Sequence, residues 1–217
     1  MPWTVIRGAE VTGRFITIEG IDGAGKSTCS ATLRQLLETQ GRAVVVTREP
    51  GGTPVGEAIR ALLLDPATRA CTDTETLLMF AARAEHLHAV VRPALARGAW
   101  VLCDRFTDAT YAYQGGGRGV PKERLDALRE WVHADLTPDL TILLDADLDT
   151  AAERRARRGG DVDRFEQEAA SFHARVRRAY LTLAQREPHR IRCLDARLSP
   201  EQQASHLSVM LLELERR

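Results

Sequence analysis

Gly20-Ile21-Asp22-Gly23-Ala24-Gly25-Lys26-Ser27 is the stretch that decides the fold of this chain, because it matches the phosphate-binding pattern G-x-x-x-x-G-K-[ST] at every specified position. The apolar run Phe15–Ile18 precedes it, and a helical pattern follows it. In such a setting successive backbone N–H groups face one anion, and the helix adds its positive end. We therefore predict that this loop, together with Thr28, holds the phosphates of a nucleotide.

Two side chains of the loop carry predicted chemistry. Lys26 brings a mobile positive charge to the outer phosphates, and Ser27 is placed to ligate the Mg²⁺ that accompanies a nucleoside triphosphate. The alternative, a glycine-rich turn that only joins a strand to a helix, is disfavoured by the strand before the loop and the helix after it. The loop alone leaves the use of the nucleotide open, since kinases, switches and motors share it.

Length, charge and cysteine content restrict the class of protein. The chain has 217 residues and a formal net charge of +0, which suits one domain, or one domain with a mobile lid. This balance argues against a dedicated binder of nucleic acid or of anionic membranes. The four cysteines lack metal-binding spacing, and Met1–Gly8 is too short and too polar for a signal peptide or membrane span. We expect a cytoplasmic protein with no nucleic-acid or membrane partner.

Five apolar, β-branched runs alternate with helical stretches, which predicts a buried five-stranded parallel sheet flanked by helices, an α/β fold. The first helix should run from the phosphate loop to Gly41, and a long helical stretch should cover Thr74–Ala96. After Phe15–Ile18, the predicted strands are Ala43–Val46, Trp100–Cys103, Leu140–Leu144 and Arg190–Leu194.

Charged residues follow the predicted strands at the point where each strand ends. Arg48 and Glu49 follow the second strand, Asp104 and Arg105 the third, and Asp145 the fourth. The carboxyl ends of parallel strands border the ligand crevice, where guanidinium groups bind phosphate bidentately. We therefore predict phosphate contacts for Arg48 and Arg105, ordinary surface ion pairs being the alternative. Asp104 is predicted to orient Mg²⁺, and Asp145 competes for that role.

Two further segments carry candidate chemistry. The arginine-rich stretch Ala151–Arg158, followed by Gly159 and Gly160, predicts a lid over residues 154–165, because arginines on a closing segment stabilise a migrating phosphoryl group and exclude water. A solvated helix face is the alternative. The stretch Tyr111–Gly119 combines aromatic rings, an amide and a flexible turn, which favours a pocket for a nucleobase over a plain loop.

Taken together, these segments resemble bacterial thymidylate kinases, which transfer the γ-phosphoryl group of ATP to dTMP. The resemblance implies a P-loop nucleoside monophosphate kinase fold with a mobile lid, ATP as co-substrate, Mg²⁺ as cofactor, and a homodimer. The product would be dTDP, made together with ADP and destined for dTTP. The segments that carry the resemblance occur in family order: the phosphate loop with Asp22, Thr47–Thr53, Asp104–Phe106, Tyr113–Gly115 and Asp163–Glu166.

The resemblance also implies a role for each matching residue. Asp22 and Glu49 would lie near the sugar and phosphate of the acceptor, and Lys26 and Ser27 at the β/γ-phosphates and Mg²⁺. Arg155 and Arg157 would stabilise the transferring phosphoryl, since Ala24 stands where another branch of the family carries an arginine. The implied substrate contacts are Arg48, Arg83 and Arg105 on the monophosphate and thymine, Thr110 and Gln114 on the base edge, and Tyr113 against the sugar 2′ position. The implied catalytic set is Asp22, Lys26, Arg105, Arg155 and Arg157.

Three points stay open at this stage. The family commonly places a phenylalanine four residues before Arg83, to stack on thymine, whereas Met79 stands there and Phe80 comes one residue later. Either residue could meet the base. Residues 1–13 precede the family match and carry no recognisable motif, so we treat them as an extension before a single domain over 14–217. A kinase for dUMP or dCMP, or a slowly hydrolysing nucleotide switch, remains a rival function.

Overall fold

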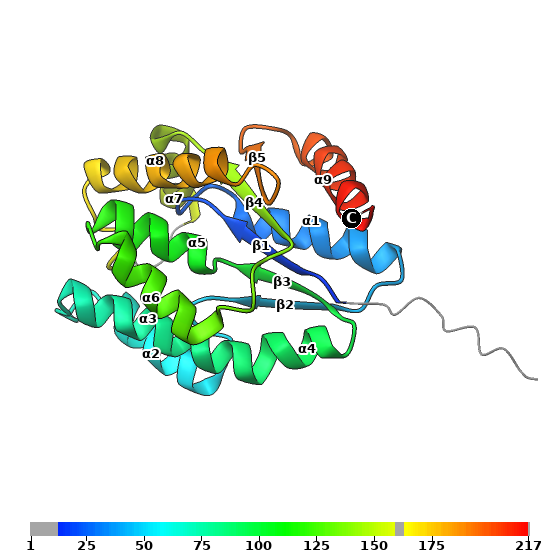
Figure 1. Cartoon of the computed structure of the whole chain (residues 1–217). Coiled ribbons are helices and arrows are strands. Elements are labelled where there is room, and N and C mark those ends of the chain that lie inside the picture. The colour runs from blue at the N-terminus through cyan, green and yellow to red at the C-terminus, as the bar shows by residue number, and fades with distance from the viewer. Residues whose placement is uncertain (1–12, 159–162, 217) are drawn as a thin grey trace, which may run out of the picture.

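Five strands form one fully parallel sheet in the computed structural model, which describes residues 13–158 and 163–216 (Figure 1). The strand order is β2-β3-β1-β4-β5, so β1 lies at the centre. The predicted sheet and its five strands are thereby confirmed. The strands are β1 Phe15–Glu19, β2 Val44–Arg48, β3 Trp100–Asp104, β4 Leu140–Asp145 and β5 Ile191–Asp195.

Each strand ends one or two residues later than the sequence predicted. Arg48 is the last residue of β2 and lies opposite Asp104, the last residue of β3. Pairing even continues past the strands, since Glu49 N donates to Asp104 O at 2.9 Å and Arg105 N donates to Ile18 O at 3.0 Å. The predicted charged residues therefore stand on the rigid rim of the sheet rather than in loose loops.

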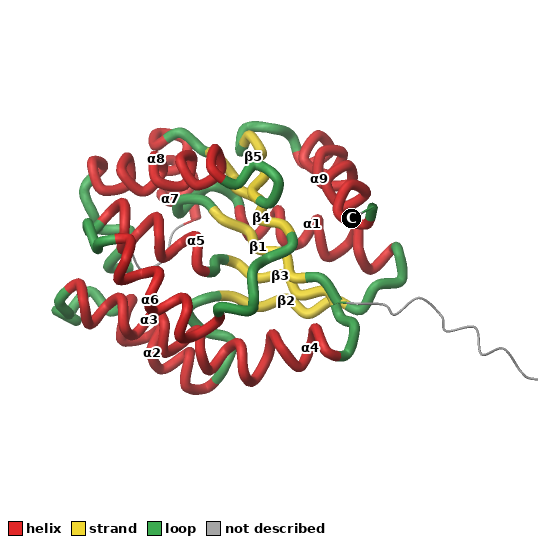
Figure 2. The backbone as a smooth tube through the Cα atoms, viewed as in Figure 1, coloured by secondary structure: helices red, strands yellow, loops and turns green. Residues whose placement is uncertain are grey.

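Helices cover both faces of the sheet (Figure 2). On one face Ile16 and Ile18 share a buried cluster with Leu33 and Leu37 of α1. On the other face Phe15 packs with residues of the long helical stretch, as the two-residue alternation of a strand requires. The helices are α1 Lys26–Thr39, α2 Pro54–Leu64, α3 Thr72–His86, α4 Arg92–Ala96, α5 Thr107–Thr110, α6 Lys122–His133, α7 Leu148–Arg158, α8 Ala170–Arg186 and α9 Pro200–Glu215, with π-helical turns at Leu87–Val91 and Tyr111–Gly117.

The long stretch predicted over Thr74–Ala96 is helical from Thr72 onward, but it is not a regular α-helix. Between α3 and α4 the backbone takes a π-helical turn, in which Arg92 N donates to Leu87 O, five residues back. Pro93 follows directly and has no N–H to continue the α-helical ladder. The proline accounts for a break in the pattern that apolar periodicity alone does not reveal.

Parts of two predictions fall on residues outside the described ranges. These are residues 1–12 of the proposed extension and residues 159–162 of the proposed lid. The division into an extension, a single domain and a lid therefore stays a prediction. Within the described ranges, none of the helices has the length and apolar character needed to cross a membrane.

Candidate active site

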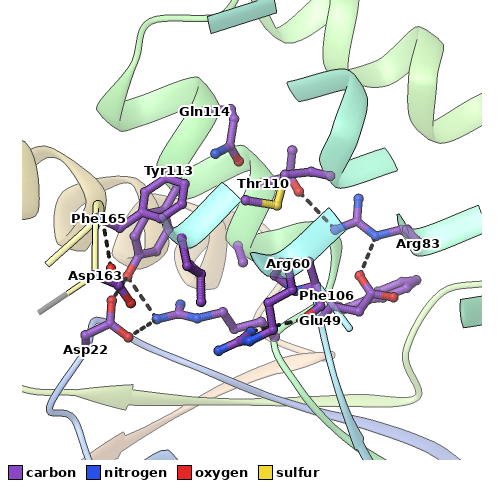
Figure 3. Close-up of a pocket in the computed structure, with 15 residues that line it drawn as sticks. Asp22, Glu49, Arg60, Arg83, Phe106, Thr110, Tyr113, Gln114, Asp163 and Phe165 are labelled. Atoms are coloured by element: carbon purple, nitrogen blue, oxygen red, sulfur yellow. Dashed lines mark hydrogen bonds and ion pairs between the residues drawn. The ribbon is translucent and has the colours of Figure 1, made fainter. Parts of the chain in front are cut away.

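Two cavities adjoin at the carboxyl edge of the sheet. The inner pocket, of about 80 Å³, lies among α2, α3, α5 and the Tyr111–Gly117 turn (Figure 3). The outer cavity, of about 610 Å³, opens over the phosphate loop. An anion bound in one cavity would lie beside an anion bound in the other, because the two cavities share part of their walls. The shared residues are Asp22, Glu49, Arg60, Arg105 and Asp163.

The phosphate loop curls around the outer cavity as its sequence predicted. Gly25 precedes α1 with a φ of 100°, in the left-handed region that favours glycine. Lys26 Nζ folds back onto the loop and donates to the carbonyl oxygens of Gly20 and Ile21, at 3.2 Å each. Burial, and then Arg105, lower the pKa of Lys26. A bound phosphate would therefore meet a buried cation whose hydrogen bonds among the described residues go to carbonyl groups and whose ion-pair partner, Asp22, lies 3.7 Å away.

Only part of the predicted phosphate loop reaches this cavity. Asp22, Gly23, Gly25, Lys26 and Ser27 line it. Gly20, Ile21, Ala24 and Thr28 do not line it; Ile21 and Ala24 are buried, and Thr28 is exposed on the first turn of α1. A Cβ atom at Gly23 would collide with the carbonyl oxygen of Ala151, which explains why α7 can lie so close to the loop.

Arg105 lines both cavities and makes four hydrogen bonds where the two cavities meet. Its Nη2 donates to Asp22 Oδ1 at 2.6 Å and to the Tyr113 hydroxyl at 3.0 Å, and its Nη1 donates to Gly20 O at 3.0 Å and to Tyr180 at 3.2 Å. Burial would raise the pKa of Asp22, but Arg105 and then Lys26 outweigh it and hold that pKa well below its usual range. Asp22 is therefore a carboxylate that fixes Arg105 toward the site.

Glu19, which the sequence analysis did not single out, supports Arg105 from inside the fold. Its carboxyl group accepts hydrogen bonds from Phe106 N and from the Tyr180 hydroxyl, at 2.7 Å each. Burial, with Asp108 adding to it, raises the pKa of Glu19 to about 8. A largely protonated Glu19 at neutral pH does not compete with Asp22 for Arg105. Its position at the end of a buried strand was the available signal.

A buried hydrogen-bonded chain crosses the far wall of the inner pocket. Arg83 Nε donates to Glu49 Oε2 at 2.7 Å, and Arg83 Nη2 donates to Thr110 Oγ1 at 3.0 Å (Figure 3). His86 Nδ1 lies 2.9 Å from the other oxygen of Glu49. Burial would raise the pKa of Glu49, but Arg83 and then His86 lower it. Arg83 Nη1 has no hydrogen-bond partner in the part of the chain that the structure describes, so the N–H groups of this nitrogen are left for a ligand.

Met79 and Phe80, the two candidates for a contact with the base, differ in their positions. Met79 lines the inner pocket, whereas Phe80 is only 2% exposed and packs with Val120 and Leu125 behind the wall. The ring of Phe80 instead supports Arg83, whose guanidinium carbon lies 4.8 Å from the ring centroid. Phe80, predicted as a substrate contact, is thus not part of the pocket surface, because one helical residue turns the side chain by about 100°.

Arg60 is a pocket residue that the sequence analysis missed. It lines both cavities and its Nη1 donates to Pro50 O at 3.0 Å. Burial, and then the neighbouring cations Arg48 and Arg105, lower the pKa of Arg60, which marks a site with surplus positive charge. The available signal was spacing, since Arg60 lies four residues after Gly56 and three before Leu63, the two buried positions of α2.

Arg48, by contrast, lies at the margin of the site. It lines the outer cavity only, its side chain is 52% exposed, and its Nη2 donates to both oxygens of Glu57 at 2.9 Å. A surface ion pair was the alternative that the sequence left open, but the partner is Glu57 and not the adjacent Glu49, which pairs with Arg83. Arg48 and Arg60 come from neighbouring elements, yet only Arg60 faces both cavities.

The arginines of α7 differ in what they reach. Arg155 Nη1 donates to Asp22 O at 2.8 Å. Arg154, which was not predicted, lines the outer cavity and donates to Ala196 O at 2.9 Å. Arg157 is 79% exposed and pairs with Glu153 at 3.3 Å, so the structure does not bring it to the cavity. Of the two predicted lid arginines, Arg155 therefore contacts the phosphate loop and Arg157 faces solvent.

The two predicted Mg²⁺ ligands lie in the same cavity. Ser27 and Asp104 both line the outer cavity, and Asp104 Oδ1 is buried without a hydrogen-bond partner among the described residues. An unpaired carboxylate oxygen beside a phosphate loop fits a hard cation that takes oxygen ligands. Asp145, the competing candidate, is held by Arg177 through two hydrogen bonds of 2.6 and 2.9 Å and does not line this cavity.

Comparisons with known proteins agree with this geometry. A sequence model of the family described as thymidylate kinase matches residues 18–206. A thymidylate kinase of Chromobacterium violaceum is 60% identical over 185 residues, which cover 85% of this chain and 86% of that protein. One from Thiobacillus denitrificans is 55% identical, with coverage of 93% and 98%. A crystal structure of a thymidylate kinase from Ehrlichia chaffeensis matches with a TM-score of 0.71 and 33% identity, over 94% of this chain and 98% of that one.

Proposed function

Because the chain belongs to the thymidylate kinase family, we propose that it transfers the γ-phosphoryl group of ATP to the 5′-phosphate of dTMP. One observation carries this proposal: a second pocket adjoins the phosphate loop, and Arg60 and Arg105 stand where the two cavities meet. A nucleotide switch needs only the loop cavity, whereas a kinase needs two anions end to end.

The inner pocket offers a polar edge that matches thymine. Arg83 Nη1 has no partner among the described residues, and the Gln114 amide nitrogen donates away from the pocket to Glu75, which leaves the amide oxygen as an acceptor for the pocket. Thymine presents a carbonyl acceptor next to an imide N–H donor, whereas cytosine presents the reverse order. Apolar groups of Leu64, Met79 and Phe165 complete the wall and suit a flat base. This pattern supports dTMP or dUMP over dCMP.

Tyr113 is proposed to favour deoxyribose. Its hydroxyl donates to Asp22 Oδ2 at 3.0 Å, and the guanidinium of Arg105 lies 4.8 Å from its ring centroid. The ring is therefore held from two sides and has little freedom to move away from a 2′-hydroxyl. Glu49 and Asp22 lie between the base end and the phosphate end of the pocket, where a sugar would sit.

The proposed reaction depends on positioning and charge rather than on a proton carrier. The attacking oxygen belongs to a monophosphate that is already anionic, so no general base is required. Arg60 and Arg105 would hold that monophosphate, while Lys26 would hold the β/γ-phosphates of ATP. Arg155 would lie closest to the migrating group among the predicted lid arginines. Four cations around one transfer point would offset the repulsion between the two nucleotides.

Mg²⁺ is part of the proposal. Ser27 would ligate it and Asp104 would orient it, directly or through water. When bound, the ion would neutralise negative charge on the β/γ-phosphates. The acceptor would be held by Arg60 and Arg105 of this chain, which line both cavities.

The test is a substrate panel with purified enzyme, in which ADP release is coupled to NADH oxidation. We expect saturable, dTMP-dependent release, a lower kcat/KM with dUMP, and a much lower one with dCMP. Binding of ATP without any dTMP-dependent release would contradict the kinase and support the switch. A kcat/KM for dCMP equal to that for dTMP would contradict the proposed base recognition.

A homodimer and a cytoplasmic location are also proposed. Large apolar side chains are exposed on three helices: Leu62 on α2, Leu77 on α3 and Trp131 on α6, which are 47%, 53% and 83% exposed. Burial of these side chains against a second copy would remove them from water. Light scattering during size-exclusion chromatography should give twice the chain mass, and Leu77→Glu should reduce it to one. A wild-type chain that stays monomeric at micromolar concentration would refute the dimer.

A further inference from the structure

Glu75 is a buried carboxylate at the junction of three segments, and it lies outside the inner pocket. It belongs to the first turn of α3 and is 1% exposed. Its Oε1 accepts from Gln114 Nε2 at 2.8 Å, and its Oε2 accepts from Arg164 Nη2 at 2.6 Å. Arg118 approaches both oxygens at 3.4 Å. Two guanidinium groups and one amide therefore meet on this single side chain.

The chemistry of these partners determines how the Gln114 amide is oriented. A carboxylate only accepts hydrogen bonds, so the amide must turn its NH₂ group toward Glu75. The carbonyl oxygen of the same amide then points the other way. Gln114 is 1% exposed and lines the inner pocket, where Figure 3 shows its amide group. With no charge at Glu75, either orientation of the amide could be satisfied.

We propose that Glu75 is a positioning residue for base selectivity: it holds the Gln114 amide oxygen toward the inner pocket, where that oxygen accepts a hydrogen bond from an imide N–H. The selected class is a pyrimidine monophosphate with a 3-position N–H, as in thymine and uracil. Cytosine places a lone pair at that position and would face the oxygen of Gln114 unfavourably. This inference rests on the proposed function, because it concerns the acceptor of the same reaction.

Neighbouring hydrogen bonds hold Gln114 and Glu75 in place. Gln114 O accepts from Val120 N at 2.9 Å, which fixes the backbone that carries the amide. Arg164 also donates to Leu63 O at 3.0 Å, so the guanidinium that holds the other oxygen of Glu75 is itself fixed to the backbone. The amide therefore cannot follow a wrong base without breaking a buried hydrogen bond, and a site of this kind rejects substrates that leave a buried polar group unpaired.

The test is Glu75→Gln, assayed with dTMP and with dCMP. The neutral side chain keeps the shape but lets the Gln114 amide turn over. We expect the ratio of kcat/KM for dTMP to kcat/KM for dCMP to fall roughly tenfold, a change the size of one hydrogen bond. The matched control is Arg118→Gln, which touches the same carboxylate and should leave the ratio within about twofold. Glu75→Asp keeps an acceptor-only group and should preserve the ratio.

Two further measurements separate positioning from general damage. In a Gln114→Met background, Glu75→Gln should no longer change the ratio, because there is no amide left to orient. In the wild-type protein, the Gln114 side-chain amide protons should be protected from hydrogen exchange without substrate, since they face Glu75. This measurement tests the inference even if Glu75→Gln does not fold.

An unchanged ratio in Glu75→Gln, an equal fall in Arg118→Gln, or rapidly exchanging amide protons in the wild type would overturn the inference. None of these results would touch the proposed function, which fails only if the wild-type protein does not phosphorylate dTMP. The two failures are therefore distinguishable within one set of assays.

Discussion

The two walls of the outer cavity are built in different ways. On the strand side, Arg105 is 16% exposed and bonds Asp22 and two tyrosine hydroxyls. On the α7 side, Arg154 lines the cavity and donates to two backbone carbonyls, Ala24 O at 3.4 Å and Ala196 O at 2.9 Å. Arg155 donates to one backbone carbonyl of the phosphate loop, and Arg157 faces solvent. The strand wall is held in place by buried partners before any ligand arrives. The α7 wall has fewer partners to lose, which suits a segment that closes over a substrate.

This comparison predicts that Arg105 is the most sensitive arginine of the site. Arg105→Ala should lower kcat/KM for dTMP by roughly 10²–10³, the effect of removing a preorganised charge from a transition state. Steady-state rates with ATP and dTMP measure it. Arg178→Ala, which removes an exposed arginine of α8, is the matched control and should change little.

Because the loss of Arg105 removes the ion pair of 2.6 Å that holds the partly buried Asp22, thermal unfolding must be measured alongside. Arg105→Lys keeps the charge but cannot reach all four partners at once. Rates within a few-fold of wild type in both variants would show that the strand wall is not the preorganised one.

On the α7 wall, the two predicted lid arginines should behave unequally. Arg155→Ala should lower kcat by roughly 10² with little change in the KM for dTMP, because a lid arginine acts on the migrating phosphoryl. Arg157→Ala should stay within about threefold of wild type, since its only described partner is Glu153, four residues away. Both are read from kcat at saturating ATP. The opposite order would mean that α7 turns a different face to the substrate during turnover.

Arg60 and Arg48 should differ in their effect on the binding of the acceptor, dTMP. Arg60→Ala should raise the KM for dTMP at least tenfold, as expected for a hydrogen bond to a charged group of about 1.5–3 kcal/mol. Arg48→Ala should change it less than about threefold, because that side chain is half exposed and held by Glu57. Isothermal titration with dTMP provides an independent check. Equal effects of the two substitutions would show that Arg48 contacts the acceptor phosphate, as the sequence predicted.

A prediction for stability rather than rate tests the support behind the strand wall. The pKa of Glu19 is about 8 in the folded chain and near 4.5 when unfolded, so the folded state keeps a proton that the unfolded state has lost. Its contribution to stability is therefore complete below about pH 4.5 and declines as the pH rises toward about 8. Glu19→Gln should flatten this decline in the free energy of unfolding, measured with urea across that range. Parallel curves for the two proteins would contradict it.

Most of the fold was predictable because its signals are local. Five apolar runs with helical stretches between them identified the sheet, and the phosphate loop identified the edge of the sheet where ligands bind, whereas the strand order with β1 at the centre was not predicted. The π-helical turn before Pro93 was not predicted, because the apolar pattern of a helix hardly changes when one hydrogen bond shifts by a residue. Strand ends were placed too early, since pairing partners come from strands distant in the chain.

Residues of the site were predictable where they stand next to a motif or where the family resemblance implied them, as it did for Arg83 and Gln114. Asp22, Lys26 and Arg105 follow strand ends and line the cavities as expected. Arg60 belongs to a helix with no motif of its own, and Glu75 touches the site only through Gln114. Such positions depend on how helices lie across the sheet edge, which no local pattern encodes.

The amino-acid sequence alone was thus enough to place a phosphate loop at the carboxyl edge of a parallel sheet and to predict that charged residues lie at the same edge. Only the tertiary structure decided that Arg60 rather than Arg48 faces both cavities, that Met79 rather than Phe80 lines the pocket, and that Asp104 rather than Asp145 has an unpaired oxygen. The physical reason is that strand and loop signals follow from neighbours in the chain, whereas the direction of a side chain follows from packing between distant elements.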